Sequence, residues 1–318
     1  EIYQISDTFL LSDILRLTSN KYYDIFGLEM LAFPSLASFS QSVYMQTLQR
    51  EGETIELLTN SDMYYFFSKN IVGGICRLGP KRSITLNHPA MSNFDTKKPI
   101  SLLTMVDING MYSGIMSRDA LPRGRYRFLN EIETKSLFLD LVENKSYDNW
   151  TDEYYRVEID EQGRVIHYGC TLEVTVGLID DEQRRRFDHL PLFEQKIKIP
   201  SNWLSPFQLE MYKKLGKRLP DNTERIVLTL HDKCAVVDYR YLKFALQTNA
   251  YQLIKLGRVV EYEQRPFMRS YTQFCANLRQ KSKTSVDNNF FKLLCNIQYG
   301  RSLLNKCNYK NVEFVFSK

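Results

Sequence analysis

The chain has 318 residues, of which 43% are hydrophobic and 25% charged, with a net charge of +5 and an isoelectric point near 8.7. This composition, with 20 Tyr and 19 Phe, excludes a disordered chain and predicts a core of ordinary size divided among two or three subdomains. No apolar run approaches the roughly 20 residues of a membrane-spanning helix, and the mild positive charge permits a polyanionic partner without indicating one by itself.

The first elements predicted along the chain are a helix and a buried strand. Residues 5–17 carry apolar side chains at helical spacing, which predicts an amphipathic helix. These apolar positions are Ile5, Phe9, Leu10, Ile14 and Leu17. Residues 101–107 form an apolar run that ends in Asp107, which favours a buried strand with a carboxylate at its end. Asn109-Gly110 then predicts a turn.

The middle of the chain alternates between regular and irregular segments. Residues 170–177 alternate with the period of a half-buried strand, with Cys170, Leu172, Val174 and Val176 on one side. Residues 178–225 are charged and interrupted by prolines, which predicts a surface insertion. Its basic clusters, residues 184–186 and 213–218, could contact phosphate or could form an ordinary solvated face.

The last part of the chain is predicted to be mainly helical. Helices are expected at residues 239–253, 267–281 and 286–306, and a strand at 258–263. The six cysteines and four histidines lack zinc-binding spacing, so we expect free thiols in a reducing compartment. The chain begins at Glu1 with no initiator Met and no signal sequence, which suggests a piece of a longer protein.

One predicted helix has a face suited to a nucleotide. Lys292, Asn296 and Tyr299 stand at i, i+4 and i+7, so they share one side of the helix and offer an ammonium, an amide and a ring. A triphosphate and its nucleoside would need such groups; the alternative is a solvated surface face. The residues expected on the opposite, apolar face are Phe290, Leu293, Leu294 and Ile297.

Two segments resemble the polymerase motifs of family B DNA polymerases. The pattern from Lys292 to Gly300 resembles motif B, K-x-x-x-N-S-x-Y-G, with Ile297 in place of the usual Ser. The segment from Asp107 to Tyr112 resembles motif A, D-x-x-S-L-Y-P, with Ser113 in place of the Pro. The resemblance implies that Asp107 binds both catalytic metal ions and that Tyr112 packs under the incoming sugar.

Two upstream segments add weaker resemblances in the order expected for this family. Residues 71–74 are similar to the Y-x-G-G element that touches template DNA, although Ile71 departs from Tyr; Gly73 and Gly74 would let backbone approach a phosphate. Tyr3 and Asp7 resemble the third exonuclease motif, whose carboxylate holds a metal ion during 3′ to 5′ proofreading.

Connecting segments narrow the resemblance to the protein-primed type found in DNA viruses and large self-replicating transposons of the Maverick or Polinton kind. These segments are residues 199–206, 230–233, 239–243 and 260–264. The resemblance implies an α+β fold with a palm sheet, helical fingers and the C-terminal end of an RNase H-like exonuclease domain. Expected boundaries are 1–60 for the exonuclease end, 61–130 for the template-contact loop and motif A, 131–265 for the continued palm with its insertion, and 266–318 for the fingers.

The function implied is DNA-directed DNA polymerisation with two Mg²⁺ ions, in which Lys292 and either Arg279 or Lys281 grip the triphosphate and Gly300 contacts DNA. One carboxylate cannot hold two metal ions, and residues 301–318 contain no D-T-D motif C, so we expect this chain alone to be inactive. The alternative is a transposon-derived remnant that binds DNA or nucleotide without turnover. Expected partners are primer-template DNA, dNTPs and, in the protein-primed case, a priming terminal protein, with no membrane. The compartment beyond an intracellular one, whether nucleus, cytoplasm or viral factory, stays open.

Overall fold

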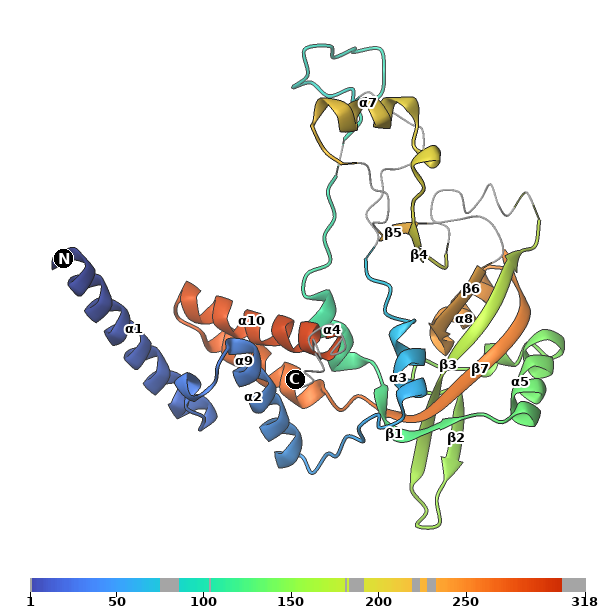
Figure 1. Ribbon diagram of the computed structural model, residues 1–318, viewed down its shortest axis with the longest axis horizontal. Coiled ribbons are helices and arrows are strands. Elements are labelled where there is room, and N and C mark those ends of the chain that lie inside the picture. The colour runs from blue at the N-terminus through green and yellow to red at the C-terminus, as the bar shows by residue number, and fades with distance from the viewer. Residues whose placement is uncertain are drawn as a thin grey trace, which may run out of the picture. The chain divides into compact units, whose positions relative to one another are not determined.

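The computed structural model describes residues 2–74, 86–102, 104–180, 182, 192–218, 224–227 and 233–304, which form two compact units (Figure 1). We call the first the helical unit; it comprises Glu1–Leu57, Asn109–Gly124 and Glu263–Lys318. The second, which we call the sheet unit, comprises Leu58–Ile108 and Arg125–Tyr262. Each unit is therefore built from segments that are distant in the sequence.

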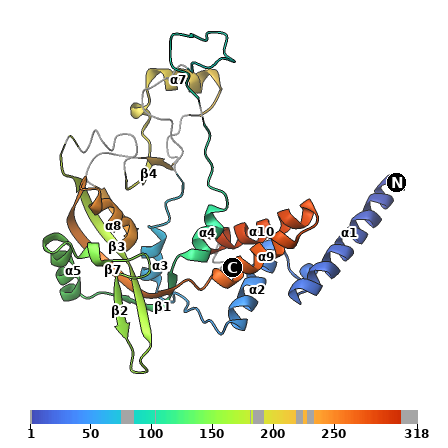
Figure 2. The same cartoon turned by 180° about the vertical axis from the view of Figure 1, so that it is seen from behind.

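The helical unit packs its helices around one apolar core. Its helices are α1 (Ile2–Phe26), η1 (Met30–Ala32), α2 (Leu36–Arg50), α4 (Met111–Arg118), α9 (Arg269–Lys281) and α10 (Ser285–Ser302). Helix α10 contacts α2, α4 and α9, as both views show (Figures 1 and 2). Aromatic rings dominate the core: the ring of Phe26 meets those of Phe39 and Phe274 edge to face at centroid distances of 5.5 and 5.9 Å.

Side-chain caps fix where these helices begin. The Ser35 hydroxyl accepts a hydrogen bond from the Ser38 amide at the start of α2, and the Thr284 hydroxyl accepts from the Asp287 amide at the start of α10. Helix α4 instead follows Gly110, whose φ of 66° lies in the left-handed region that glycine adopts without strain. The predicted Asn109-Gly110 turn is thus confirmed.

Among the described residues, the sheet unit contains five strands in one sheet and two in another. Its strands are β1 (Leu121–Phe128), β2 (Arg156–Ile159), β3 (Val165–Leu178), β4 (Gln195–Lys198), β5 (Glu224–Val227), β6 (Lys233–Asp238) and β7 (Tyr251–Arg265). The larger sheet has the order β1-β7-β3-β2, and β6 pairs with β3 beyond the end of β2. The pairings of β3 with β2 and with β6 are antiparallel, as is the pairing of β4 with β5 in the smaller sheet.

Helices accompany these strands in the sheet unit. They are α3 (Ser61–Ser68), α5 (Glu131–Glu143), η2 (Ser146–Asn149), η3 (Ser201–Trp203), α7 (Pro206–Lys214) and α8 (Tyr239–Gln247). Of these, α3, α5, η2 and α8 contribute to the cores of the sheet unit. The strand predicted at residues 170–177 is confirmed, because Cys170, Leu172, Val174 and Val176 are all buried in the core that contains α8; on its other side Thr171 and Gly177 are buried too, so the strand is more than half-buried. The α+β fold class predicted from the sequence therefore holds for the described residues.

The predicted helices are largely confirmed, with two corrections. Residues 5–17 lie within α1, but their apolar side chains are exposed, so the helix shows no buried apolar face over this range. The helix predicted at 239–253 ends at Gln247, because Asn249 adopts a left-handed φ of 55° and Tyr251 begins β7. The strand predicted at 258–263 lies within β7.

The strand predicted at residues 101–107 is wrong for its described residues. None of them belongs to a strand, and Leu102, Met105 and Val106 are exposed, Met105 by 95%. An apolar run forms a buried strand only where neighbouring strands satisfy its backbone hydrogen bonds. No strand in the described part of the chain pairs with this segment.

The predicted insertion is only partly visible. Helix α7 begins with a capping box between Ser205 and Gln208 and has no buried residue, in keeping with a surface segment. Four basic side chains, Lys213, Lys214, Lys217 and Arg218, are exposed at its end. Residues 184–186 lie outside the described residues. None of the described helices combines the length and apolar composition that crossing a membrane requires.

The capping box of α5 gives a testable prediction about stability. The Asn130 Oδ1 accepts from the Glu133 amide at 2.9 Å, and the Glu133 carboxylate accepts from the Asn130 amide at 2.8 Å. Asn130→Ala removes the first of these bonds, so we expect the free energy of unfolding to fall by about 1 kcal/mol in urea denaturation. The control is Ser136→Ala on the exposed side of α5, which should leave stability equal or slightly higher. Equal effects of both changes would contradict the capping role.

Candidate functional site

The motif B-like helix α10 presents the three predicted residues on one side. Lys292 and Asn296 are exposed and Tyr299 is half-buried, in agreement with a shared accessible face. The buried side differs from the prediction, because it consists of Phe291, Leu294, Cys295 and Gln298. The predicted apolar residue Leu293 is 45% exposed. The sequence pattern could not fix this rotation, since it depends on which neighbouring helices cover α10.

Side chains of two neighbouring helices anchor α10 by donating hydrogen bonds to its backbone. The carbonyl of Leu294 accepts from the hydroxyls of Ser40 on α2 and Tyr271 on α9, each at 3.1 Å. Leu294 itself is fully buried. These bonds hold the middle of the helix against two neighbours and leave the face with Lys292 and Asn296 open.

The aromatic residues of the two polymerase-like motifs lie against each other. The rings of Tyr112 on α4 and Tyr299 on α10 stack with centroids 3.9 Å apart and planes 18° apart. Burial, followed by the electrostatic interaction and the hydrogen bond with the neighbouring Tyr112, raises the pKa of Tyr299. Tyr112 remains 43% exposed, so one side of the pair is open to solvent. The fold thus joins two residues that stand far apart in the sequence.

The predicted phosphate-binding cations Arg279 and Lys281 lie at the end of α9. Both side chains are exposed. The Arg279 Nε donates to Asn288 Oδ1 on α10 at 3.1 Å, so the end of α9 is tied to the start of the motif B-like helix. Arg279 therefore supplies a cation that is held beside the first turn of α10.

Among the described residues, neither carboxylate predicted to bind metal belongs to a cluster of ligands. Asp107 is exposed and belongs to the sheet unit, whereas Tyr112 and Lys292 belong to the helical unit. Asp7 and Tyr3 are exposed on α1. Across the described residues, no group of three or more His, Cys, Asp or Glu side chains could hold a metal ion. The described residues therefore offer single carboxylates rather than a complete metal site.

The predicted DNA-contacting glycines are accessible. Gly73 has a left-handed φ of 95°, and both Gly73 and Gly74 are exposed. A Cβ added at Gly74 or Gly300 would meet no atom within 4 Å. In the sheet unit, a cavity of about 720 Å³ adjoins Ile71 and Val72 and is lined further by β6 and the segment around Phe193. Open backbone at these glycines suits close approach by another molecule.

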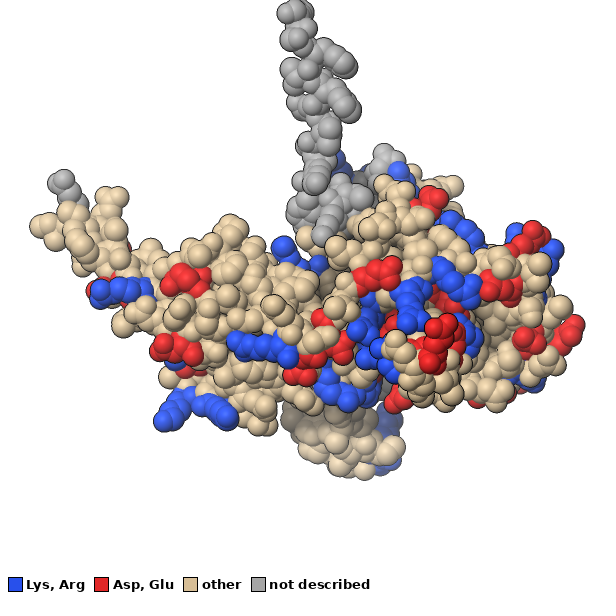
Figure 3. Space-filling view, turned by 90° about the horizontal axis from the view of Figure 1, so that it is seen from below, with Lys and Arg blue, Asp and Glu red and all other residues tan. Residues whose placement is uncertain are grey.

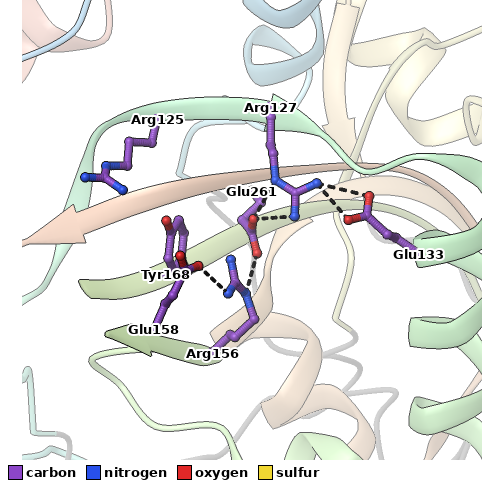
Figure 4. A pocket seen from close by; sticks show the side chains of 7 residues that line it. All are labelled: Arg125, Arg127, Glu133, Arg156, Glu158, Tyr168 and Glu261. Carbon is purple, nitrogen blue, oxygen red and sulfur yellow. Dashed lines mark hydrogen bonds and ion pairs between the residues drawn. The ribbon is translucent and has the colours of Figure 1, made fainter. Parts of the chain in front are cut away.

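Sequence analysis missed a second cavity, of about 510 Å³, on one face of the larger sheet (Figure 4). Its centre is Glu261 on β7, which is 1% exposed. The Arg127 guanidinium donates to Glu261 and to Glu133, and the Arg156 guanidinium donates to Glu261 at 2.8 Å and to Glu158. A possible signal was the alternation of Arg123, Arg125 and Arg127 along β1, with Glu261 and Glu263 in β7.

The charges in this cavity balance one another. Burial alone would raise the pKa of Glu261, but hydrogen bonds from Arg156 and Tyr155 and the charges of Arg156 and Arg127 hold it below its ordinary value. Glu133 and Glu158 face the same arginines, so the cavity lining holds three arginines and three glutamates. Acidic and basic side chains are also intermixed on the face seen in Figure 3. We therefore assign the network to stability rather than to anion binding.

Comparisons with known proteins find similarity between this chain and DNA polymerases. The family model described as "DNA polymerase type B, organellar and viral" matches residues 1–177, which is more than half of the chain. The chain matches no curated protein. Among solved structures, Phi29 DNA polymerase complexed with primer-template DNA has 11% identity and a TM-score of 0.42, covering 90% of this chain. The complex with primer-template DNA and incoming nucleotide substrates has 10% identity and a TM-score of 0.41, covering 88%. The chain spans 38% and 37% of these two structures.

Proposed function

Because this chain belongs to the organellar and viral type B family of DNA polymerases, we propose that it is the part of a DNA-directed DNA polymerase that grips the incoming nucleotide. The reaction is nucleotidyl transfer from a dNTP to a primer 3′ hydroxyl. The stack of Tyr112 on Tyr299 carries this proposal, because it unites the aromatic residues of motifs A and B in one place.

In this proposal, the tyrosine pair forms the floor for the sugar and base of the nucleotide. Tyr112 packs under the deoxyribose and excludes the 2′ hydroxyl of a ribonucleotide, and Tyr299 contacts the nucleoside beside it. The open side of the pair and the parallel rings suit stacking against a flat group. Asn296 shares the accessible face of α10 and can hydrogen-bond to the same ligand.

The triphosphate would be held by cations on α9 and α10. Lys292 provides a point charge without a fixed geometry, whereas Arg279 provides a planar fork of donors. Arg279 is already positioned by Asn288, and exposed Lys281 adds a further positive charge at the same helix end. Three cations on one helix pair would neutralise the charge that develops on the leaving pyrophosphate.

Members of this family generally use divalent metal ions, and we propose two Mg²⁺ ions here. Asp107 offers the hard oxygen ligand that Mg²⁺ prefers, so its chemistry fits. Two such ions would stabilise the attacking and leaving oxygens. A single carboxylate cannot complete that site, and the described residues contain no cluster that would. The residues of this chain therefore contribute nucleotide binding and one metal ligand.

Further contacts are proposed from the remaining predicted residues. Gly73, Gly74 and Gly300 would admit the backbone of primer-template DNA, and Tyr3 and Asp7 would contribute to a proofreading exonuclease. The insertion that contains α7 would face the priming terminal protein and DNA, with its exposed lysines near phosphate. We also propose the domain boundaries predicted from the sequence, and an origin of the chain in a virus or a transposon.

The test measures nucleotide binding and primer extension separately. The chain with Mg²⁺ and primer-template DNA is titrated with a fluorescent dNTP, and we expect Lys292→Ala to weaken binding about tenfold or more through loss of a charged phosphate contact. The control is Lys135→Ala, an exposed residue of α5. Unchanged affinity of Lys292→Ala would contradict the nucleotide site.

Primer extension is measured for the chain and for any longer product of its gene. We expect Asp107→Ala to abolish extension by an active product, because the charge of a metal ligand is lost. Full activity of this variant would rule out the assignment of Asp107. Nucleotide binding without extension by any product would favour the alternative of a non-catalytic remnant.

A further inference from the structure

An unusual ion pair joins the first turn of α10 to α1. Asp287 is 7% exposed although it is charged, and the Lys21 ammonium donates to both of its carboxylate oxygens at 2.6 Å. The Tyr22 hydroxyl also donates to it at 3.3 Å, and the Thr284 hydroxyl at 2.7 Å. Four hydrogen bonds from three side chains therefore converge on one buried carboxylate.

The cap of α10 does not by itself explain this arrangement. Thr284 caps the helix through the Asp287 amide, and an acid in the first turn already suits the helix dipole. Neither effect requires burial or a cation from a distant part of the chain. A buried carboxylate is costly unless it is paired, so Lys21 makes its burial possible.

Ring contacts strengthen the same junction. Tyr22 is 2% exposed, and its ring stacks on that of Phe290 with centroids 3.8 Å apart and planes 9° apart. It also meets Phe291 edge to face at 6.0 Å. The junction of α1 with α10 thus combines a buried carboxylate, paired with the half-exposed Lys21, with a packed aromatic cluster, so the first turns of α10 have little freedom to shift.

We propose that Asp287 is a positioning residue of the nucleotide-binding helix and that Lys21 on α1 holds it in place. Lys292 follows Asp287 by about 7.5 Å along α10, at a rise of 1.5 Å per residue. On α1, the exonuclease candidate Asp7 precedes Lys21 by about 21 Å along the same helix. The nucleotide grip therefore depends on the helix that carries the exonuclease candidates. This inference rests on the proposed nucleotide site.

The experiment uses the whole chain with Mg²⁺, primer-template DNA and a fluorescent dATP analogue. Lys21→Met and Asp287→Asn each remove the charge pair while keeping the size of the side chain, and we expect each to weaken nucleotide binding about five- to tenfold. Lys21→Arg should restore affinity close to that of the unaltered chain. Amide hydrogen exchange should rise in α10 of the first two variants, from Phe290 to Tyr299, and remain unchanged in the sheet unit.

Two controls separate positioning from general loss of stability. Lys135→Met breaks the exposed pair of Lys135 with Glu131 on α5, and Asn130→Ala weakens α5 itself; neither should change nucleotide affinity. Unaltered affinity in Lys21→Met and Asp287→Asn overturns this inference alone. Failure of the unaltered chain to bind the analogue overturns the proposed nucleotide site together with it. Equal weakening by Asn130→Ala also overturns the inference, because affinity would then follow stability alone.

Discussion

Glu261→Gln is expected to lower the free energy of unfolding of the chain by about 2–4 kcal/mol in urea denaturation. Removing one partner of a buried ion pair typically costs about 3–5 kcal/mol, because the other charge is left without compensation. Here the side chains of Arg127 and Arg156 are 47% and 37% exposed, so water can recover part of that loss. Glu261 also accepts a hydrogen bond from the Tyr155 hydroxyl. The uncharged amide of the substituted Gln would accept this bond less strongly than the carboxylate does.

The same network predicts how the effect depends on pH. The pKa of Glu261 is lowered in the folded chain, so its contribution to stability is fully present above its unfolded pKa of about 4.3 and is lost as the pH falls through the lower folded value. The difference in unfolding free energy between the unaltered chain and Glu261→Gln should therefore be constant from about pH 6 upward. It should shrink below about pH 4 as Glu261 becomes neutral.

A matched control lies in the same cavity. Glu158 pairs with Arg156 at 2.8 Å, but its side chain is 47% exposed. Glu158→Gln should therefore cost less than about 1 kcal/mol. If the two substitutions cost the same, or if Glu261→Gln costs nothing, the buried carboxylate does not stabilise the sheet in the way that its contacts indicate.

The sequence correctly predicted those elements whose hydrophobic pattern repeats over several helical turns or several strand residues. Residues 170–177 alternate, and the side of β3 with Cys170, Leu172, Val174 and Val176 is buried because it packs into the core that contains α8. The run at 101–107 is also apolar but has no strand beside it among the described residues, so the apolar run alone predicted the wrong element. Pairing partners come from distant segments, and a local pattern contains no information about them.

The candidate site shows the same limit at the level of side chains. Spacing sufficed to put Lys292, Asn296 and Tyr299 on one side of a helix, because a helix fixes relative angles. Spacing could not show that Tyr112 stacks on Tyr299, nor that Lys21 reaches Asp287, since both contacts join segments that meet only in the folded unit. Whether these residues act in catalysis stays a prediction.

The orientation of α10 buries Leu294, so we expect the second large loss of stability on substitution of this residue. Leu294→Ala is expected to lower the free energy of unfolding by about 3–5 kcal/mol, because it removes a fully buried side chain from a packed core and leaves a cavity. The rings of Phe291 and Tyr271 belong to the same core and are fixed by their own contacts, so the site cannot easily collapse. Denaturation in urea, monitored by far-UV circular dichroism, measures the change.

The neighbouring residue supplies the control for this prediction. Leu293 is the preceding residue of the same helix and is 45% exposed, so Leu293→Ala should change stability by less than about 1 kcal/mol. The pair also distinguishes the observed rotation of α10 from the one predicted by sequence, in which both leucines face the core. If Leu293→Ala costs as much as Leu294→Ala, the predicted apolar face is the buried one. The accessible face with Lys292 and Asn296 would then have to be reassigned as well.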